Sequence, residues 1–359
     1  MWMMLIAVTA TFLLFFYRVS FPLKTSTTST AFSIIIPARN EEENLTRLLP
    51  SILHEGDHLE VIVVDDNSED RTCEIAEGFG VKVISTPPLP EGWLGKPWAC
   101  YNGAKEATGE FFCFLDADTW FENHGVKRLG SYVETMESNE LVTIHPYHCM
   151  RSFREKLSLL FHLVVFASTG ITSVFRDFLG TKGGFGACMV IPEKTYWELG
   201  GHYAVKHEIV EHLTFCRKAE SRGVTIHAFS GKNLLNMRMY PAGLGAIIEG
   251  WSKSMASGAK SASPFMLILT ITWLSTVISF LVQLPSMNWK FAAGFLLIAF
   301  FLYRFLQDVG NVRWYDALLF PVHVFFFVGL FVYSLMRNLS GKSTWKGRKI
   351  VARKKRSSS

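Results

Sequence analysis

The chain lacks the sequence motifs of two common nucleotide-binding folds. No G-x-G-x-x-G follows the first predicted strand, and no G-x-x-x-x-G-K-[ST] occurs anywhere. These absences exclude the usual dinucleotide and P-loop phosphate cradles. The six cysteines include no C-x-x-C pair. That scatter is typical of reduced cytoplasmic thiols.

Charged residues are missing from the first 17 positions (MWMMLIAVTATFLLFFY), and Arg18 and Lys24 follow. An apolar run of this length can span a bilayer if it is slightly stretched. A secretory signal peptide would carry its positive charges before the run rather than after it. The segment therefore predicts an uncleaved anchor with its N-terminus outside and the next domain in the cytoplasm.

Charge is also scarce after Lys260. Residues 261–289 hold no charged side chain, Phe291–Tyr303 is a second uncharged run, and Leu318–Met336 is a third apolar run. Pro285 and Asn288 predict a turn between the first two, and hence a helical hairpin. The pattern indicates membrane helices in this part of the chain.

No acidic residue occurs from Arg337 onward, and this tail holds nine lysines and arginines. Because the whole chain has a net charge of only +5, the part before the tail is net negative. Such a tail suits an anionic membrane face better than nucleic acid. If the N-terminus lies outside and three further segments span, the basic tail also lies outside the cell. Basic segments prefer the cytoplasmic side, so we expect that one apolar segment does not span. We expect an anchor, a catalytic domain, C-terminal transmembrane helices and a basic cytoplasmic-type tail over residues 1–23, 24–260, 261–337 and 338–359.

The catalytic domain shows short apolar runs that alternate with helical patterns. This alternation predicts βαβ units and a mostly parallel α/β sheet. The predicted strands are Phe32–Ile36, Glu60–Val64, Val81–Ile84 and Phe111–Leu115. The predicted helices between them are Asn40–Leu53, Arg71–Phe79 and Trp98–Ala107.

Polar clusters follow three of these strands, with the sequences PARNEE (37–42), DDNS (65–68) and DAD (116–118). Ligands of α/β sheets bind at the carboxyl ends of the strands, so the three clusters are expected to meet in one crevice. The alternative for each cluster taken alone is a helix cap or a turn. The paired carboxylates of DAD suit Mg²⁺ or Mn²⁺, which usually bridge a carboxylate to a substrate diphosphate.

Together, PARNEE, VDDNS and LDAD resemble the nucleotide-sugar site of inverting family 2 glycosyltransferases of the GT-A fold, from about Phe32 to Trp251. The resemblance implies a UDP-sugar donor, with Glu41 and Asp66 facing the nucleobase and ribose. It implies Asp116 and Asp118 as metal ligands, with Asp118 also a catalytic residue. The donor-site residues implied in this way are Pro37, Arg39, Glu41, Asp65, Asp66, Lys96, Asp116, Arg238 and Trp251.

Two of these assignments have plain alternatives. Lys96 is placed to meet the diphosphate, or else it is an exposed loop lysine. Trp251 falls, like Arg238, where related membrane enzymes contact acceptor or diphosphate, or else it is a membrane-interface aromatic. The chain lacks the Q-x-x-R-W of processive polysaccharide synthases, which favours a single transfer over polymerisation.

Further segments resemble the carotenoid-acid glycosyltransferases, namely GWLGKPWACYNGA, HPYH (145–148), RMYPAGLGAIIEGWSK (238–253) and WKGR (345–348). The resemblance implies a multi-pass enzyme of the bacterial cell membrane that moves glucose from UDP-glucose to the carboxylate of a C30 carotenoid acid. Other carotenoid-pathway enzymes are candidate partners. The alternatives are a polyprenyl phosphate or other lipid acceptor, and an inactive pathway scaffold. The two histidines of HPYH have no further ligands at the spacing of a zinc site, and such histidines are more often structural.

One position departs from the family pattern. Family 2 enzymes usually carry an E-D pair whose Asp is the general base, and this chain has Glu211 and His212 there. A carboxylic acid with a pKa of about 4–5 is already ionised near pH 7 and needs no base. We therefore hypothesise a glycosyl ester product, with Glu211 and His212 as catalytic-site residues that place the acceptor. A phosphate acceptor, His212 as the base itself and a helix-surface His212 are the alternatives.

Two more segments have open interpretations. Leu157–Phe175 is apolar with only His162 ionisable, so it is expected to lie in the membrane interface or to line an acceptor groove. A buried core helix is the alternative. Gly183–Ala187 (GGFGA) is expected to let the backbone approach the substrate closely, or to form a tight turn.

Overall fold

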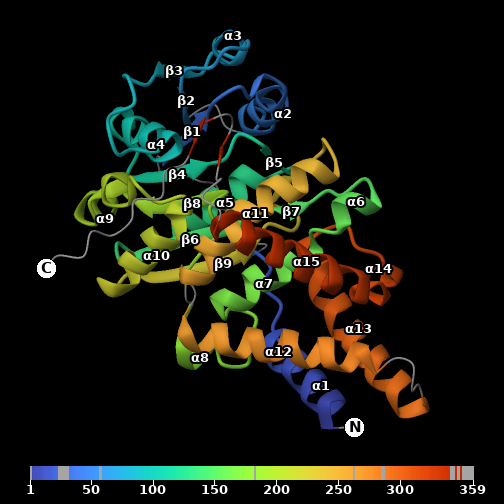
Figure 1. Cartoon of the computed structure of the whole chain (residues 1–359). Helices are drawn as coiled ribbons and strands as arrows, with labels where there is room; N and C mark the ends of the chain where they lie inside the picture. Colours follow the sequence, from blue (N-terminus) through green and yellow to red (C-terminus); the bar gives the residue numbers. More distant parts are fainter. Residues whose placement is uncertain are drawn as a thin grey trace, which may run out of the picture.

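The computed structural model combines a mixed α/β unit with a layer of long apolar helices (Figure 1). Figure 1 shows α1 and α12 at the end of the molecule away from β1, β2 and β3. The structure describes residues 2–22, 32–55, 59–181, 183–261, 263–283, 288–339, 344–345 and 348–349, without the side chains of 253–261, 337–339, 344–345 and 348–349.

The main sheet has seven strands in the order β3-β2-β1-β4-β8-β6-β9. Neighbouring strands are parallel except at β8, which runs antiparallel to both β4 and β6. The predicted, mostly parallel sheet is therefore confirmed. The strands are β1 (Phe32–Ala38), β2 (Glu60–Asp65), β3 (Lys82–Ser85), β4 (Phe111–Leu115), β6 (Glu140–His145), β8 (Cys188–Pro192) and β9 (Thr225–Ser230).

Helices cover both faces of this sheet because its strands are apolar on both sides. The helices and the 3₁₀ turn are α2 (Glu42–Leu53), α3 (Thr72–Gly78), α4 (Gly95–Glu106), α5 (Gly125–Val133), α9 (Glu193–Glu198), η1 (Gly201–Val205) and α10 (Glu211–Ser221). The three predicted helices are present. Helix α4 begins three residues earlier than predicted, because Pro97 lies in its first turn, where no backbone donor is needed.

A small second sheet lies next to the main one and has the order β5-β10-β7. Its strands are β5 (Thr119–Phe121), β10 (Leu235–Met237) and β7 (Tyr147–His148). Strand β5 directly follows the DAD cluster, and β10 leads into the segment that begins at Arg238. The second sheet therefore brings that late segment towards the ends of the central strands.

The apolar helices share one continuous core. Its main members are α1 (Trp2–Leu14), α7 (Leu159–Thr169), α11 (Leu244–Ser261), α12 (Pro264–Val282), α13 (Trp289–Val309) and α15 (Phe320–Leu339), with α6 (Phe153–Lys156), α8 (Arg176–Leu179) and α14 (Trp314–Leu318) as short connecting helices. Trp273 of α12 is fully buried and donates a 2.9 Å hydrogen bond to Thr11 of α1. Residues from both ends of the chain thus pack together.

Within the described residues, α12 and α13 are long and apolar enough to cross a membrane by length and composition, and α1 and Phe320–Met336 are shorter apolar helices. The predicted turn at Pro285 lies outside the described residues. So does most of the predicted basic tail, apart from the end of α15 and a two-stranded hairpin of β11 (Thr344–Trp345) and β12 (Arg348–Lys349).

The apolar segment inside the catalytic domain forms the buried helix α7. It packs against α12, α13 and α15, and eight of its 11 residues are buried. The buried-helix interpretation is therefore confirmed for this helix. Ion pairs reinforce the same junction, since the buried carboxylate of Asp308 at the end of α13 contacts Arg18 and lies 3.5 Å from Lys232.

Candidate active site

The ends of β1, β2 and β4 carry the three predicted polar clusters to one edge of the sheet. In the parallel register Ala38 lies beside Asp65, and Ile35 lies beside Phe114. Arg39 donates a 3.0 Å hydrogen bond to the Asp66 carbonyl oxygen, and its guanidinium lies 3.6 Å from the Asp66 carboxylate. The clusters meet because neighbouring parallel strands end at the same level.

The first two clusters are braced against each other by side-chain hydrogen bonds to the backbone. Asn40 accepts from the amide of Glu69 at 2.8 Å, and its own amide donates to Ser68 at 3.0 Å. Asp70 accepts from the amides of Glu42 and Thr72 at 3.2 and 3.0 Å. Asn40 and Asp70 therefore hold the two loops in place against each other.

Lys96, in the first turn of α4, is the electrostatic centre of this edge. Its ammonium lies 2.7 Å from Asp116 and 3.1 Å from Glu211, and 3.4 Å from the carbonyl oxygen of Gly186. Burial alone would lower the pKa of Lys96, but the two carboxylates outweigh it and hold that pKa well above its ordinary value. Lys96 is thus a permanent cation and not an exposed loop lysine.

Glu211 is the ionised partner of this lysine. Burial would raise the pKa of Glu211, yet the charge of Lys96 and the neighbouring His212 hold it well below its usual range. The His212 Nδ1 lies 4.0 Å from the Glu211 carboxylate. The Glu-His pair therefore begins α10 directly at the Lys96 cluster, and His212 belongs to this site.

The DAD cluster carries negative charge that Lys96 does not balance. The pKa of Asp118 rises to about 7 because of burial and of the nearby carboxylates of Asp116 and Glu41. Several oxygen ligands with excess negative charge are the donor set that a hard divalent cation prefers. The residues present therefore fit a Mg²⁺ or Mn²⁺ ion.

At two positions of the site, neighbouring side chains lie so close to the backbone that only glycine fits. A Cβ on Gly186 would lie 2.3 Å from His212 Nδ1, and a Cβ on Gly95 would lie 2.4 Å from the Asp66 carboxylate. The GGFGA segment was expected to approach a substrate; at Gly186 its backbone instead approaches the His212 side chain. Asp116 also donates its amide to Ala187 at 2.8 Å, which joins this segment to the DAD cluster.

Tyr240 is a site residue that the sequence analysis did not single out. Burial and the charge of Asp118 both raise its pKa, and a Cβ on Gly250 of α11 would lie 2.3 Å from its hydroxyl. Its φ of +59° is unusual for a bulky residue and is typical of a functional position. The only signal in the sequence is its place in the RMYPAG segment.

Arg238 and Trp251 lie on the side of the apolar helices and have protein partners. Arg238 forms a 3.0 Å ion pair with Glu155 of α6. Trp251 is only 9% exposed, stacks on Phe161 with 4.7 Å between ring centroids, and donates to Ser158 at 3.2 Å. Trp251 is therefore not an exposed aromatic at a membrane interface, because its ring is buried against Phe161.

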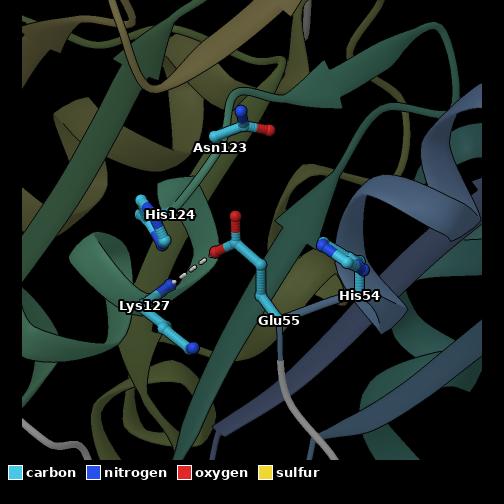
Figure 2. Close-up of a pocket in the computed structure, with 5 residues that line it drawn as sticks. All are labelled: His54, Glu55, Asn123, His124 and Lys127. Atoms are coloured by element: carbon cyan, nitrogen blue, oxygen red, sulfur yellow. Dashed lines mark hydrogen bonds between the residues drawn. The ribbon is translucent and has the colours of Figure 1, made fainter.

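A separate surface pocket lies between the end of α2 and the start of α5 (Figure 2). Figure 2 shows Glu55 within it, where the carboxylate accepts from the amide of Lys127 at 3.2 Å. The residues that line it are His54, Glu55, Asn123, His124 and Lys127, and none of them belongs to the Lys96 cluster. This pocket is therefore not part of the site around Lys96.

Comparisons with known proteins agree with this geometry. The family described as Glycosyl transferase family 2 matches residues 33–200. A 4,4'-diaponeurosporenoate glycosyltransferase of Staphylococcus haemolyticus is 34% identical over 250 residues, which cover 69% of this chain and 67% of that protein. This chain belongs to glycosyl transferase family 2. The resemblance seen in the sequence motifs is thereby confirmed, and the protein is a glycosyltransferase.

Two further comparisons extend over most of the chain. The Staphylococcus aureus protein of the same name is 28% identical over 328 residues, covering 89% of this chain and 88% of that one. A mannosyltransferase from Pyrobaculum calidifontis, solved with GDP-mannose and Mn²⁺, superposes with a TM-score of 0.52 at 14% identity, covering 94% and 99% of the two chains. That likeness shows the GT-A fold.

Proposed function

We propose that this family 2 enzyme transfers glucose from UDP-glucose to the carboxylate of a C30 carotenoid acid, forming a glycosyl ester in carotenoid biosynthesis. The reaction is a single inverting displacement at the anomeric carbon of the sugar. Two relatives that match most of their length carry the name diaponeurosporenoate glycosyltransferase, which supports the acceptor. The observation that carries the chemistry is the Lys96 cation between Asp116 and Glu211, beside Asp118.

The donor would lie along the edge formed by the three strand-end clusters. Arg39 and Asp66 hold each other at the end of β1 and β2, where the resemblance places the nucleobase and ribose. The residues that we propose to surround the uridine are Pro37, Arg39, Glu41, Asp65 and Asp66. Arg238 and Trp251 stay proposed donor-site residues, each of which would have to exchange or extend its present protein contacts.

The charge that develops on the departing diphosphate needs positive groups in place before the reaction begins. Asp116 and Asp118 would hold a divalent cation, Mg²⁺ or Mn²⁺, which supplies Lewis-acid stabilisation of the diphosphate oxygens when bound. Lys96 is already held at this edge by Asp116 and Glu211. Lys96 therefore supplies a positive charge that is in place before the diphosphate departs.

The acceptor explains why His212 can stand where relatives of the wider family have an Asp. A carboxylate nucleophile carries no proton at pH 7, so no group has to remove one. His212 and Glu211 begin α10 beside Gly186, where they can orient the acceptor against the anomeric carbon. Glu211 is held ionised by Lys96, and the His212 Nδ1 lies 4.0 Å from the Glu211 carboxylate.

His212→Ala tests this role, and we expect it to lower kcat by no more than about tenfold. The side chain orients a nucleophile and removes no proton, so only positioning is lost. The measurement is initial-rate kinetics with carotenoid acid, with His54→Ala, an exposed histidine at the end of α2, as the control. A loss above about 10³-fold, the upper range for a general base, would contradict the proposal and make His212 the base.

Binding of Mn²⁺ in the absence of nucleotide is expected to strengthen as pH rises from 6 to 8. The pKa of Asp118 is raised to about 7, so below that pH a proton occupies the carboxylate and must be displaced by the cation. The Kd should fall about fivefold between pH 6 and pH 7, about tenfold between pH 6 and pH 8, and level off above pH 8. Calorimetric titration would measure it, and Asp118→Asn should weaken Mn²⁺ binding at every pH. A Kd that does not vary with pH would contradict this assignment.

A membrane location accompanies this function. Helices α12 and α13 are apolar and long enough to span, and a C30 acid is dissolved in lipid. We propose a multi-pass protein of the bacterial cell membrane with the catalytic domain (24–260) on the cytoplasmic side. The anchor (1–23), the helical region (261–337) and the basic tail (338–359) would attach it to the membrane.

Product analysis decides between the possible acceptors. Purified enzyme in detergent receives UDP-glucose and Mn²⁺ with either a C30 carotenoid acid or a polyprenyl phosphate, and products are identified by mass spectrometry. A glucosylated carotenoid that mild alkali cleaves is expected. A glucosylated phosphate with the carotenoid unchanged would leave the donor site intact and overturn the acceptor. Failure to bind UDP with Mn²⁺ would favour an inactive scaffold.

A further inference from the structure

Three buried histidines meet between the catalytic sheet and the apolar helices. His145 ends β6, His148 ends β7, and His162 lies in α7. Their side chains are 7%, 2% and 1% exposed. One ring nitrogen from each lies within 4.8 Å of those of the other two. The group lies apart from the Lys96 cluster, and the transfer chemistry makes no use of it.

The ring nitrogens of this group are poorly accounted for by hydrogen bonds. His145 Nε2 and His162 Nδ1 lie 3.2 Å apart. His145 Nδ1, both nitrogens of His148 and His162 Nε2 are buried without a hydrogen-bond partner. Each buried polar atom left unpaired costs about 1–3 kcal/mol. Three such rings in one apolar place are therefore not explained by packing alone.

The surroundings keep these imidazoles neutral. Burial lowers the pKa of His145 to about 4, and it lowers the pKa values of His148 and His162 well below their usual value. Neutral imidazole, with a free lone pair, is the form that binds metal ions. Aromatic rings pack around the group at centroid distances of 4.7 to 5.2 Å, namely Phe166, Phe185 and Trp251.

We propose that His145, His148 and His162 together bind one Zn²⁺ ion. Zinc–nitrogen bonds of about 2.0–2.1 Å in a tetrahedron place two ligand nitrogens about 3.3 Å apart. The 3.2 Å between His145 Nε2 and His162 Nδ1 matches that separation. The ring centroid of His148 lies 3.9 Å from that of His162, and one of its nitrogens lies within 4.8 Å of the other two ligand nitrogens. A water molecule would take the fourth position.

The ligand type selects the ion. Among the described residues, no carboxylate or thiolate joins the three histidines. Imidazole suits zinc, whereas Mg²⁺ and Mn²⁺ prefer oxygen ligands. The zinc centre is therefore chemically distinct from the proposed Asp116 and Asp118 site, and it does not depend on which sugar or acceptor the enzyme uses.

The position of the centre gives it a structural role. It would join β6 and β7 of the catalytic domain to α7, which packs against α12, α13 and α15. His145 also packs against Phe185 at 5.0 Å, next to Gly186, whose carbonyl oxygen lies 3.4 Å from the ammonium of Lys96. Zinc would thus fix the apolar helices and the GGFGA segment relative to the same sheet.

Metal analysis of the full-length enzyme tests the proposal. Protein produced with added zinc and dialysed against metal-free buffer is expected to retain about one zinc per chain. His148→Gln and His162→Gln should lose it. Two controls should keep it, namely His54→Gln, which changes an exposed histidine, and Asp118→Asn, which changes the proposed catalytic metal site. Zinc-free wild-type protein, or equal zinc in His162→Gln, would overturn the proposal.

A second measurement keeps the test decisive if the histidine variants fail to fold. Wild-type protein stripped with a chelator and reloaded with Co²⁺ should show the visible absorption of four-coordinate cobalt with nitrogen ligands. The melting temperature of the wild type should fall on stripping and recover with Zn²⁺. No cobalt spectrum, or a melting temperature that zinc does not change, would overturn the centre whatever the enzyme's activity.

Discussion

Asp118→Asn is expected to lower the rate of glucosyl transfer by about 10³-fold or more while the protein stays folded. The substitution keeps the size of the side chain and removes the charge that would hold the divalent cation. That cation is the main source of stabilisation for the departing diphosphate, worth several kcal/mol, and about 4 kcal/mol corresponds to 10³ in rate. The measurement is single-turnover transfer at saturating Mn²⁺, with calorimetry of Mn²⁺ binding alongside.

The outcome for Asp118 has a simple control in the same chain. Asp177 lies in α8 and its side chain is 78% exposed, so Asp177→Asn should leave both activity and Mn²⁺ binding unchanged. The apo form of Asp118→Asn should unfold at the same temperature as the wild type, or at a higher one above pH 7, because a crowded negative charge has been removed. Transfer within tenfold of the wild type would show that Asp118 holds no essential metal.

Lys96→Met is the second substitution with a large expected effect, a loss of about 10²–10³-fold in kcat. Loss of one preorganised donor at a developing negative charge costs this much in enzymes that have been studied by mutation. Methionine keeps most of the length of the side chain but leaves Asp116 and Glu211 without their shared cation. Lys96→Arg should recover part of the activity, since it restores the charge.

The matched control for Lys96 lies in the same helix. Lys105 is an exposed residue near the end of α4, over the ring of Tyr101, and Lys105→Met should have little effect on kcat. Thermal unfolding separates lost catalysis from lost folding, because removal of one partner from a buried ion pair is itself destabilising. A Lys96→Met enzyme with wild-type kcat and a lower melting temperature would make Lys96 purely structural.

The strand-end clusters were predictable because they depend on local sequence. Each apolar run ends in polar residues, and parallel strands that neighbour each other must end at the same edge. Ala38 beside Asp65 is the direct result. The nature of Lys96 was less certain in the sequence, since a lysine in Gly-Lys-Pro could equally well face solvent. Its pairing with Glu211, 115 positions later, required the folded structure.

The apolar segments illustrate a second limit. Apolar composition alone predicts that Leu157–Phe175 is removed from water. The same composition suits a lipid environment and a protein interior, so it does not distinguish between them. The structure places α7 inside the protein because α12, α13 and α15 cover it. Trp251 is buried for a similar reason, since α11 packs against α15 and the Trp251 ring stacks on Phe161 of α7.

By itself the sequence determined the α/β class, the helices between the strands and the carboxylates at the sheet edge, because apolar periodicity and strand ends are local properties. The tertiary structure alone decided the meeting of His162 with the HPYH histidines, the pairing of Lys96 with Glu211 and the ion pair of Arg238 with Glu155. These contacts join segments far apart in the chain. They form only when the helices pack on the sheet, and no spacing in the sequence encodes that packing.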